Sequence, residues 1–347
     1  MSSSLDMIRQ FGHEEVAFFN NEKVGLKCII AIHSTSLGPA VGGCRLNPYE
    51  SEEEALFDVL RLSRGMSYKN ACAGLPLGGA KGVIIASPDQ KTEELFEAYG
   101  ECVDSLGGRY ITAEDVRTNC ENMEWVMRKT PYVTGRTNVS GNPSPFTAIG
   151  CFDGIRATAK FLYGSDDLTG LKIAVAGLGS VGMDLAEQLA KAGAKLIVTT
   201  HTNRANIEKA VNEWGAVEAL EGEIYGVECD ILAPCALGAT LNYQTIPELK
   251  CKAVAGCANN QLFDDNCGEL LKKRGIAYAP DFIINAGGVI NAGQEAFTTY
   301  NKEKVLEQVH KIYDTVYTIL EESKSTGVPE GIIATKMAED IIAKGKK

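Results

Sequence analysis

The alternation of apolar and polar positions predicts both strands and helices in the first 140 residues of the chain. Runs rich in β-branched and aromatic side chains, typical of strands, lie at residues 15–20, 26–34 and 83–85. Residues 51–74 and 93–107 instead repeat apolar positions at helical spacing. Ser51 can cap the first of these helices, and Glu54 can complete a capping box.

The later part of the chain alternates strands with helices. Residues 171–200 follow the pattern of a strand, a glycine-rich turn, a helix and a second strand, which indicates a βαβ unit. Further short apolar segments lie at residues 229–235, 253–257 and 276–288. Residues 302–325 predict an amphipathic helix with Val305, Val309, Ile312, Val316 and Ile319 on one side.

A loop rich in Gly, Ser, Asn and Pro at residues 135–150 predicts the boundary between two domains. We therefore expect an α/β protein of two domains with a cleft between them. Residues 1–140 would form a mixed-sheet substrate and catalytic domain, with residues 323–347 packing back on it. Residues 146–322 would form a Rossmann-type, doubly wound dinucleotide-binding domain.

Composition excludes several classes of protein. The 347-residue chain carries a net charge of −11, whereas a nucleic-acid partner normally requires a basic face. The N-terminal residues lack the apolar core of a secretory signal, and no apolar run approaches the length needed to span a bilayer. Eleven cysteines without a CxxC pair, and four scattered histidines, indicate free thiols and no zinc site. We expect a cytoplasmic protein without a membrane or nucleic-acid partner.

The hexapeptide GLGSVG places Gly177, Gly179 and Gly182 in GxGxxG spacing. This spacing is weak evidence alone, but here an apolar strand precedes it and an alanine-rich helix follows it. Glycines allow the tight turn and the close approach of a pyrophosphate, and the helix N-terminus offers free N–H groups. The pattern therefore predicts a dinucleotide site.

The choice between NAD and NADP stays open from the sequence. An acidic residue is expected about 20 residues after the glycine turn, to hold the ribose hydroxyls of NAD. The corresponding segment instead contains Thr200, His201 and Arg204, which are side chains that suit a 2′-phosphate. A neutral loop that tolerates NAD is the alternative.

The segment GLPLGGAKGVII, residues 74–85, places Lys81 at the mouth of a buried strand. Lys69 lies twelve residues earlier, at the end of a predicted helix, so both lysines flank one turn and could face one cleft. Asp115 follows a short strand in TAEDV. Each residue alone would more often be a solvated surface charge.

Several long motifs occur here in the order found in amino-acid dehydrogenases. They are IAIHSTSLGPAVGGCR, MSYKNA, GLPLGGAKGVII, YITAEDV, SGNPSP, GLGSVG, APCALGA, ANNQL and DFIINAGGVIN. The chain resembles the leucine/phenylalanine/valine dehydrogenase branch of the glutamate dehydrogenase superfamily over nearly its whole length. The resemblance implies NAD(P)-dependent oxidative deamination of an L-amino acid to a 2-oxo acid and ammonia, and a homo-oligomer.

The resemblance also implies a role for individual residues. Lys69 would bind the substrate carboxylate, Lys81 would act as general base, and Asp115 would help proton transfer. A lysine can act as a base near neutral pH only where its surroundings favour the neutral amine. Further contacts with substrate would come from Gly42, Gly43 and Asn259, and contacts with the cofactor from Thr147, Ala236, Asn260 and Asn285.

The substrate pocket is expected to be apolar. Glutamate-specific relatives carry a lysine where this chain has Val41, and a second substrate carboxylate would be costly to bury unpaired. Val41 and Ala292 are each smaller than their counterparts in leucine-specific relatives, whereas Val289 and Ala113 are unchanged. We expect a leucine or valine type of substrate, with phenylalanine or tryptophan as the alternative. A non-catalytic nucleotide-binding homologue is an alternative of another class.

Overall fold

The computed structural model describes residues 4–136, 138–201, 203–220 and 222–345. The chain divides into two compact units. Unit 1 comprises the described parts of residues 1–142, 289–302 and 338–347, and unit 2 comprises residues 143–288 and 303–337. In the described part of the chain, no helix is long and apolar enough to cross a membrane.

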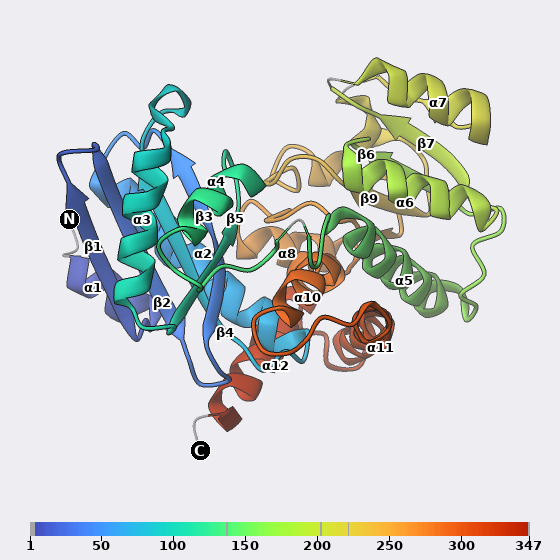
Figure 1. Ribbon diagram of the computed structural model, residues 1–347. Helices are drawn as coiled ribbons and strands as arrows, with labels where there is room; N and C mark the ends of the chain where they lie inside the picture. Colours follow the sequence, from blue (N-terminus) through green and yellow to red (C-terminus); the bar gives the residue numbers. More distant parts are fainter. Residues whose placement is uncertain (1–3, 137, 202, 221, 346–347) are drawn as a thin grey trace. The chain divides into compact units, whose positions relative to one another are not determined.

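Unit 1 is built on a mixed sheet (Figure 1). Its strands are β1 (Glu15–Asn21), β2 (Leu26–Ser34), β3 (Ala40–Asn47), β4 (Gly78–Ile85) and β5 (Tyr110–Glu114). They lie in the order β1-β2-β4-β3-β5. β2 is antiparallel to both β1 and β4, whereas β3 is parallel to both β4 and β5. The fold class expected for the substrate domain is therefore confirmed.

Helices cover both faces of this sheet. They are α1 (Ser4–Phe11), α2 (Glu52–Cys72), α3 (Glu93–Ser105) and α4 (Cys120–Met127). One face packs on α3 and α4, and the other packs on α1 and α2. Ser51 caps α2 by accepting a hydrogen bond from the backbone of Glu54 at 3.1 Å. The expected capping box is only half formed, because the Glu54 carboxylate accepts from the backbone N–H of Glu50 and not from that of Ser51.

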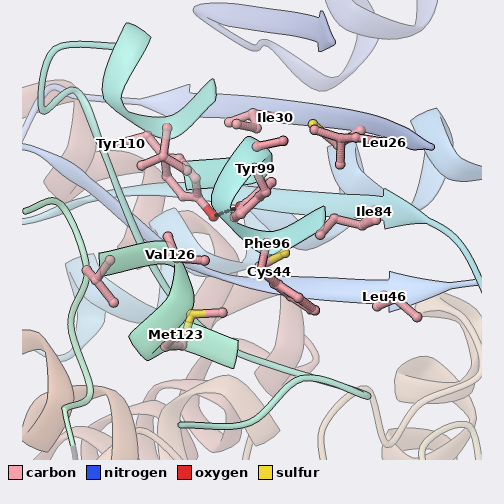
Figure 2. Packing of buried hydrophobic residues seen from close by; sticks show 14 of the residues in the cluster. Leu26, Ile30, Cys44, Leu46, Ile84, Phe96, Tyr99, Tyr110, Met123 and Val126 are labelled. Atoms are coloured by element: carbon pink, nitrogen blue, oxygen red, sulfur yellow. Dashed lines mark hydrogen bonds between the residues drawn. The ribbon is translucent and has the colours of Figure 1, made fainter. Parts of the chain in front are cut away.

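The core between the sheet and α3 contains two buried tyrosines (Figure 2). The hydroxyls of Tyr99 and Tyr110 lie 3.0 Å apart, and Tyr110 also donates to the carbonyl of Gly42 at 2.9 Å. A Cβ on Gly82 would lie 2.1 Å from the Tyr99 hydroxyl. Burial raises the pKa of both phenols, so they stay neutral hydrogen-bonding groups beneath β3 and β4.

Unit 2 contains a parallel sheet in the order β11-β10-β9-β6-β7-β8, as expected for a doubly wound domain. The strands are β6 (Lys172–Ala176), β7 (Lys195–Thr199), β8 (Val217–Glu218), β9 (Ile231–Pro234), β10 (Ala253–Val254) and β11 (Ala277–Tyr278). The helices are α5 (Ser144–Tyr163), α6 (Ser180–Lys191), α7 (Arg204–Trp214), α8 (Asp265–Lys273), α9 (Asp281–Ile284) and α11 (Lys302–Thr326).

The division into units differs from the predicted boundaries in two places. Residues 289–302, expected in the dinucleotide domain, belong to unit 1, and residues 323–337, expected to pack back on the substrate domain, belong to unit 2. The first difference follows from helix α10 (Gly287–Gln294), where Asn291 donates to the carbonyl of Ser140 at 3.0 Å. In the last helix, α12 (Glu330–Gly345), residues from Ala338 onward pack against α2.

The imidazole of His13 predicts a pH dependence of folding stability. Burial, together with the nearby His33 and Arg64, lowers the pKa of His13 from 6.5 to about 3. The unfolded chain therefore binds a proton at a pH where the folded chain does not, and stability should fall as the pH decreases. Between about pH 7 and about pH 5, a His13→Gln variant should lose about 2 kcal/mol less unfolding free energy than the wild type. Denaturant titrations at the two pH values measure this difference, and equal losses would contradict the assignment.

Candidate functional site

Lys81 and Asp115 form an ion pair on the face of the unit 1 sheet that packs against α2. The Lys81 Nζ lies 2.8 Å from Asp115 Oδ1, and the lysine side chain is only 5% exposed. Lys81 lies in β4, and Asp115 follows the last residue of β5. Since side chains alternate along a strand, Lys81 shares its face with Val83, which packs against α2. Two residues that are distant in sequence are thus brought together, as expected.

A second cation, Arg45, contacts the same carboxylate. Its Nε donates to Asp115 Oδ2 at 3.0 Å, so each carboxylate oxygen holds one cation. Burial alone would raise the pKa of Asp115, but the Lys81 ammonium and the Arg45 guanidinium outweigh it and hold this pKa well below its usual range. Asp115 is therefore a fixed anion. Arg45 was not predicted from the sequence, although strand alternation from Gly43 places it on this face.

The glycine pair of β3 lets the charged residues approach one another. A Cβ on Gly42 would lie 1.6 Å from the carbonyl oxygen of Ala80, and a Cβ on Gly43 would lie 2.8 Å from the Cβ of Asp115. Distances this short exclude any side chain at either position. Gly42 and Gly43 are therefore required for the packing of β3 against the residues beside Lys81 and Asp115.

Lys69 lies in the last turn of α2 and is half-buried. The same turn packs closely on the start of β4. Asn70 donates to the carbonyl of Gly78 at 2.6 Å, and a Cβ on Gly79 would lie 2.0 Å from the backbone nitrogen of Ser67. These contacts fix the end of α2, which carries Lys69, against the glycine-rich segment that leads to Lys81.

The four predicted pocket residues all belong to unit 1. Val41 in β3 is buried, and Ala113 in β5 pairs with Gly43. Val289 and Ala292 lie on α10, and the carbonyl of Ala292 accepts a hydrogen bond from the Thr134 hydroxyl at 2.5 Å. Strand alternation places Val41 and Ala113 on the same sheet face as Lys81. Next to Ala292, a Cβ on Gly293 would lie 3.1 Å from Leu77, so α10 packs beside the segment that precedes β4.

The glycine turn of unit 2 has the geometry of a dinucleotide site. Gly177 has a φ of +118°, and a Cβ on Gly182 would lie 2.0 Å from the carbonyl oxygen of Gly177. Gly179 is the N-cap of α6, and no side chain caps this helix terminus. A Cβ on Gly179 would enter open space, so the turn has room beside the helix N-terminus for a group as large as a pyrophosphate. The three glycines thus fit a dinucleotide cofactor.

The loop after β7 lies next to this turn, because Gly177 donates its N–H to the carbonyl of Thr199 at 3.0 Å. Thr200 is half-buried and His201 is exposed in this loop. Arg204 begins α7 and forms ion pairs with Glu208 in the same helix and with Glu218 in β8. The arginine expected to favour a 2′-phosphate is therefore already paired with carboxylates, which the sequence alone did not reveal.

The remaining predicted cofactor residues lie in unit 2 as well. A Cβ on Gly177 would lie 2.5 Å from the Cβ of Ala236, so Ala236 borders the glycine turn. Asn285 donates to Asn259 Oδ1 at 2.8 Å and to the carbonyl of Cys257 at 3.1 Å. The buried Oδ1 of Asn285 has no hydrogen-bond partner among the residues that the structure describes, so it can accept from a bound group.

Two predicted residues have unusual local backbone contacts. Asn260 has a φ of +51°, and its carbonyl accepts from the N–H of Ala239 at 2.6 Å. The hydroxyl of Thr147 donates to the carbonyl of Pro143 at 3.1 Å, in the first turn of α5, and a Cβ on Gly288 would lie 2.6 Å from this hydroxyl oxygen.

The structure describes no group of three or more metal-ligating side chains anywhere from residue 4 to residue 345, outside its three gaps.

Comparisons with known proteins identify the family. Residues 13–132 match the model "Glu/Leu/Phe/Val dehydrogenase, dimerisation domain", and residues 196–340 match "Glutamate/Leucine/Phenylalanine/Valine dehydrogenase". A leucine dehydrogenase of Bacillus cereus is 50% identical over 97% of this chain and 93% of its own length. An L-tryptophan dehydrogenase of Nostoc punctiforme is 45% identical over 99% of this chain and 97% of its own.

The crystal structure of the L-tryptophan dehydrogenase from Nostoc punctiforme superimposes on this chain with a TM-score of 0.89. It is 44% identical, and the match covers 99% of both chains. Three findings agree: two family models match, the relatives match over nearly their whole length, and the fold is shared. They are consistent with the arrangement of Lys81, Asp115 and the glycine turn described above. The chain belongs to the glutamate/leucine/phenylalanine/valine dehydrogenase family and is an amino-acid dehydrogenase that depends on a nicotinamide cofactor.

Proposed function

We propose that the protein catalyses the reversible oxidative deamination of an apolar L-amino acid, of the leucine or valine type, to a 2-oxo acid and ammonia. The observation that carries this proposal is the buried Lys81–Asp115 pair on the α2 face of the sheet. The relatives named leucine dehydrogenase and L-tryptophan dehydrogenase support an apolar or aromatic substrate.

Three charged groups of unit 1 have a role in the proposed reaction: Lys69, Lys81 and Asp115. The Lys69 ammonium binds the substrate α-carboxylate. The substrate reacts as the neutral amine, and departure of the α-carbon hydrogen as a hydride gives an iminium ion. Lys81, as the neutral amine, takes a proton from the water that attacks the iminium carbon. The resulting carbinolamine moves its hydroxyl proton to nitrogen and releases ammonia, which gives the 2-oxo acid. Asp115 stays ionised, and it holds the Lys81 ammonium that results.

Unit 2 holds the dinucleotide in this proposal. The first turn of α6, with Gly177, Gly179 and Gly182, binds the pyrophosphate, and the bound nicotinamide supplies the hydride acceptor. Ala236 and Asn285 contact the cofactor, with Thr147 and Asn260 beside them. Asn259 contacts the substrate.

The pocket residues support an apolar side chain. Val41 is buried, and a substrate carboxylate placed against it would lose its hydration without gaining a cation. Gly42 and Gly43 would line the pocket through their backbone, and Ala113, Val289 and Ala292 through small apolar side chains. Because Val41 and Ala292 are small, the pocket could also admit an aromatic side chain. Phenylalanine and tryptophan are therefore the second candidate substrates.

Initial rates with a panel of L-amino acids test the proposal. Leucine or valine should be the best substrate, and glutamate should react poorly. Phenylalanine or tryptophan as the best substrate would assign an aromatic pocket instead. Absence of turnover with every pair of amino acid and cofactor would favour a non-catalytic nucleotide-binding homologue.

We also propose that the protein assembles as a homo-oligomer, because the family model that matches residues 13–132 is described as a dimerisation domain. Light scattering coupled to size-exclusion chromatography measures the assembly mass. The mass of a single chain would contradict this part of the proposal.

Replacing Lys81 with alanine should lower kcat by about 10²–10⁴-fold, because the reaction loses its base. The variant should still fold, since Arg45 remains paired with Asp115. Cofactor binding, measured by fluorescence of the reduced dinucleotide, should stay unchanged because the glycine turn lies in unit 2. Lys27→Ala, at an exposed position of β2, is the control. Near-normal turnover of Lys81→Ala would show that another group is the base.

Replacing Ala292 with valine should narrow the pocket. The kcat/KM ratio of leucine to phenylalanine should rise about tenfold, within the range that one or two methyl groups contribute. Ala343→Val, on an exposed position of α12, is the control for unspecific effects. An unchanged ratio in the Ala292 variant would place this residue outside the pocket.

The pairing of Arg204 with Glu208 and Glu218 favours NAD⁺ over NADP⁺, because a 2′-phosphate would meet two carboxylates. Wild-type kcat/KM should therefore be higher with NAD⁺. Replacing Glu218 with glutamine removes one of the two carboxylates beside the guanidinium, and the NAD⁺ preference should fall about tenfold. Glu213→Gln, in the same helix as Arg204, is the matched control. A wild-type preference for NADP⁺ would contradict this inference.

A further inference from the structure

Arg45 has no role in the mechanism proposed above, yet it contacts the group that holds the base. Its Nε donates to Asp115 Oδ2 at 3.0 Å, while Lys81 occupies Oδ1 at 2.8 Å. The carboxylate of Asp115 is therefore shared between two cations. In a simple pair with lysine, both of its oxygens would instead be available to the ammonium.

The Arg45 guanidinium is held in place from its other side. Its Nη1 lies 2.9 Å from Asp58 Oδ2, and the hydroxyl of Tyr49 donates to the same oxygen at 2.7 Å. Arg61 contacts the second oxygen of Asp58 at 3.1 Å. Asp58 and Arg61 both lie on α2, so the helix that carries Lys69 also fixes Arg45.

These contacts form a chain of alternating charges that crosses from β4 to the surface of α2. Its members, in order, are Lys81, Asp115, Arg45, Asp58 and Arg61. The exposed fraction of the side chain is 5% at Lys81, between 15% and 22% at the three middle members, and 40% at Arg61. The buried end of the chain is the end where the proposed base lies, and there charge interactions are least screened by water.

We propose that Arg45 is a positioning residue of the deamination reaction. It fixes the Asp115 carboxylate and weakens its attraction for the Lys81 ammonium, because it occupies the second oxygen of that carboxylate. The inference rests on the proposed function, in which Lys81 is the general base. Arg45 does not touch the reacting atoms in this account; it acts through Asp115.

Three other titratable groups feel the charge of Asp115, and they do not change charge near neutral pH. They are the thiol of Cys44 and the phenols of Tyr49 and Tyr110. Burial raises the pKa of Cys44 to about 12 and raises those of both tyrosines, with Asp115 adding to the effect. All three stay neutral near neutral pH. Lys81 is the other cation on this carboxylate, and the Arg45 charge acts on it through Asp115.

The pH dependence of kcat/KM for leucine with NAD⁺ tests this inference in full-length Arg45 variants. Arg45→Gln removes the charge, and the acidic limb of the profile should move to higher pH by about one unit, since opposite and like charges at this range act on that scale. Activity should recover at high pH. Arg45→Lys keeps the charge and should leave the limb near its wild-type position.

Two further variants keep the test decisive. Arg45→Met is a second neutral replacement, which retains the apolar stem packing if Arg45→Gln does not fold, and it should show the same shift. Arg61→Gln removes a cation that contacts Asp58 but not Asp115, and it should leave the limb in place. The shift should therefore follow the charge at position 45 and not the general loss of a surface arginine.

An unmoved acidic limb in the neutral Arg45 variants would overturn the inference. A rate that falls by the same factor at every pH would do so too, because it would assign Arg45 a structural role alone. In both cases the wild-type enzyme still turns over leucine, so the proposed function stands. Absence of wild-type turnover with any amino acid would overturn the proposed function, and this inference with it.

Discussion

Burial of the Lys81 ammonium is the constraint on which the rest of unit 1 depends. Removing one partner of a buried ion pair costs several kcal/mol, so the lysine requires Asp115 at hydrogen-bond distance. Lys81 lies in β4 and Asp115 directly follows β5, and β3 separates these two strands in the sheet. A side chain at Gly42 or Gly43 would prevent this approach. The glycines and the strand order together allow Asp115 to reach the buried Lys81 ammonium and neutralise its charge.

The same pair creates a difficulty for catalysis. A carboxylate at 2.8 Å stabilises the lysine ammonium, whereas a general base has to be a neutral amine. The structure offsets this with Arg45, which takes the second oxygen of Asp115 and is itself fixed by Asp58 of α2. Asp115 thereby remains an anion, but its charge is shared between Lys81 and Arg45. This sharing keeps the buried lysine paired and at the same time weakens the stabilisation of its ammonium form.

Much of this could be predicted from the sequence, and the failures have physical causes. The strand-turn-helix pattern around Gly177 and the lysine beside a buried strand were both readable, because each depends on local spacing. Arg45 and the partners of Arg204 were not recognised, because ion pairs between strands and helices depend on tertiary packing. Helix α10 joins unit 1 for the same reason, through hydrogen bonds to a loop about 150 residues earlier in the chain.

The ionisation state of Asp115 is the most direct test of this account. Carbon NMR of protein labelled at the aspartate carboxyl carbons follows each carboxylate through a pH titration, and comparison with an Asp115→Asn variant assigns the signal. The account predicts that the Asp115 signal keeps the chemical shift of an ionised carboxylate throughout the range in which exposed aspartates titrate, because Lys81 and Arg45 hold its pKa below that range. A titration of Asp115 near neutral pH would contradict the account, since the carboxylate would then carry the proton itself.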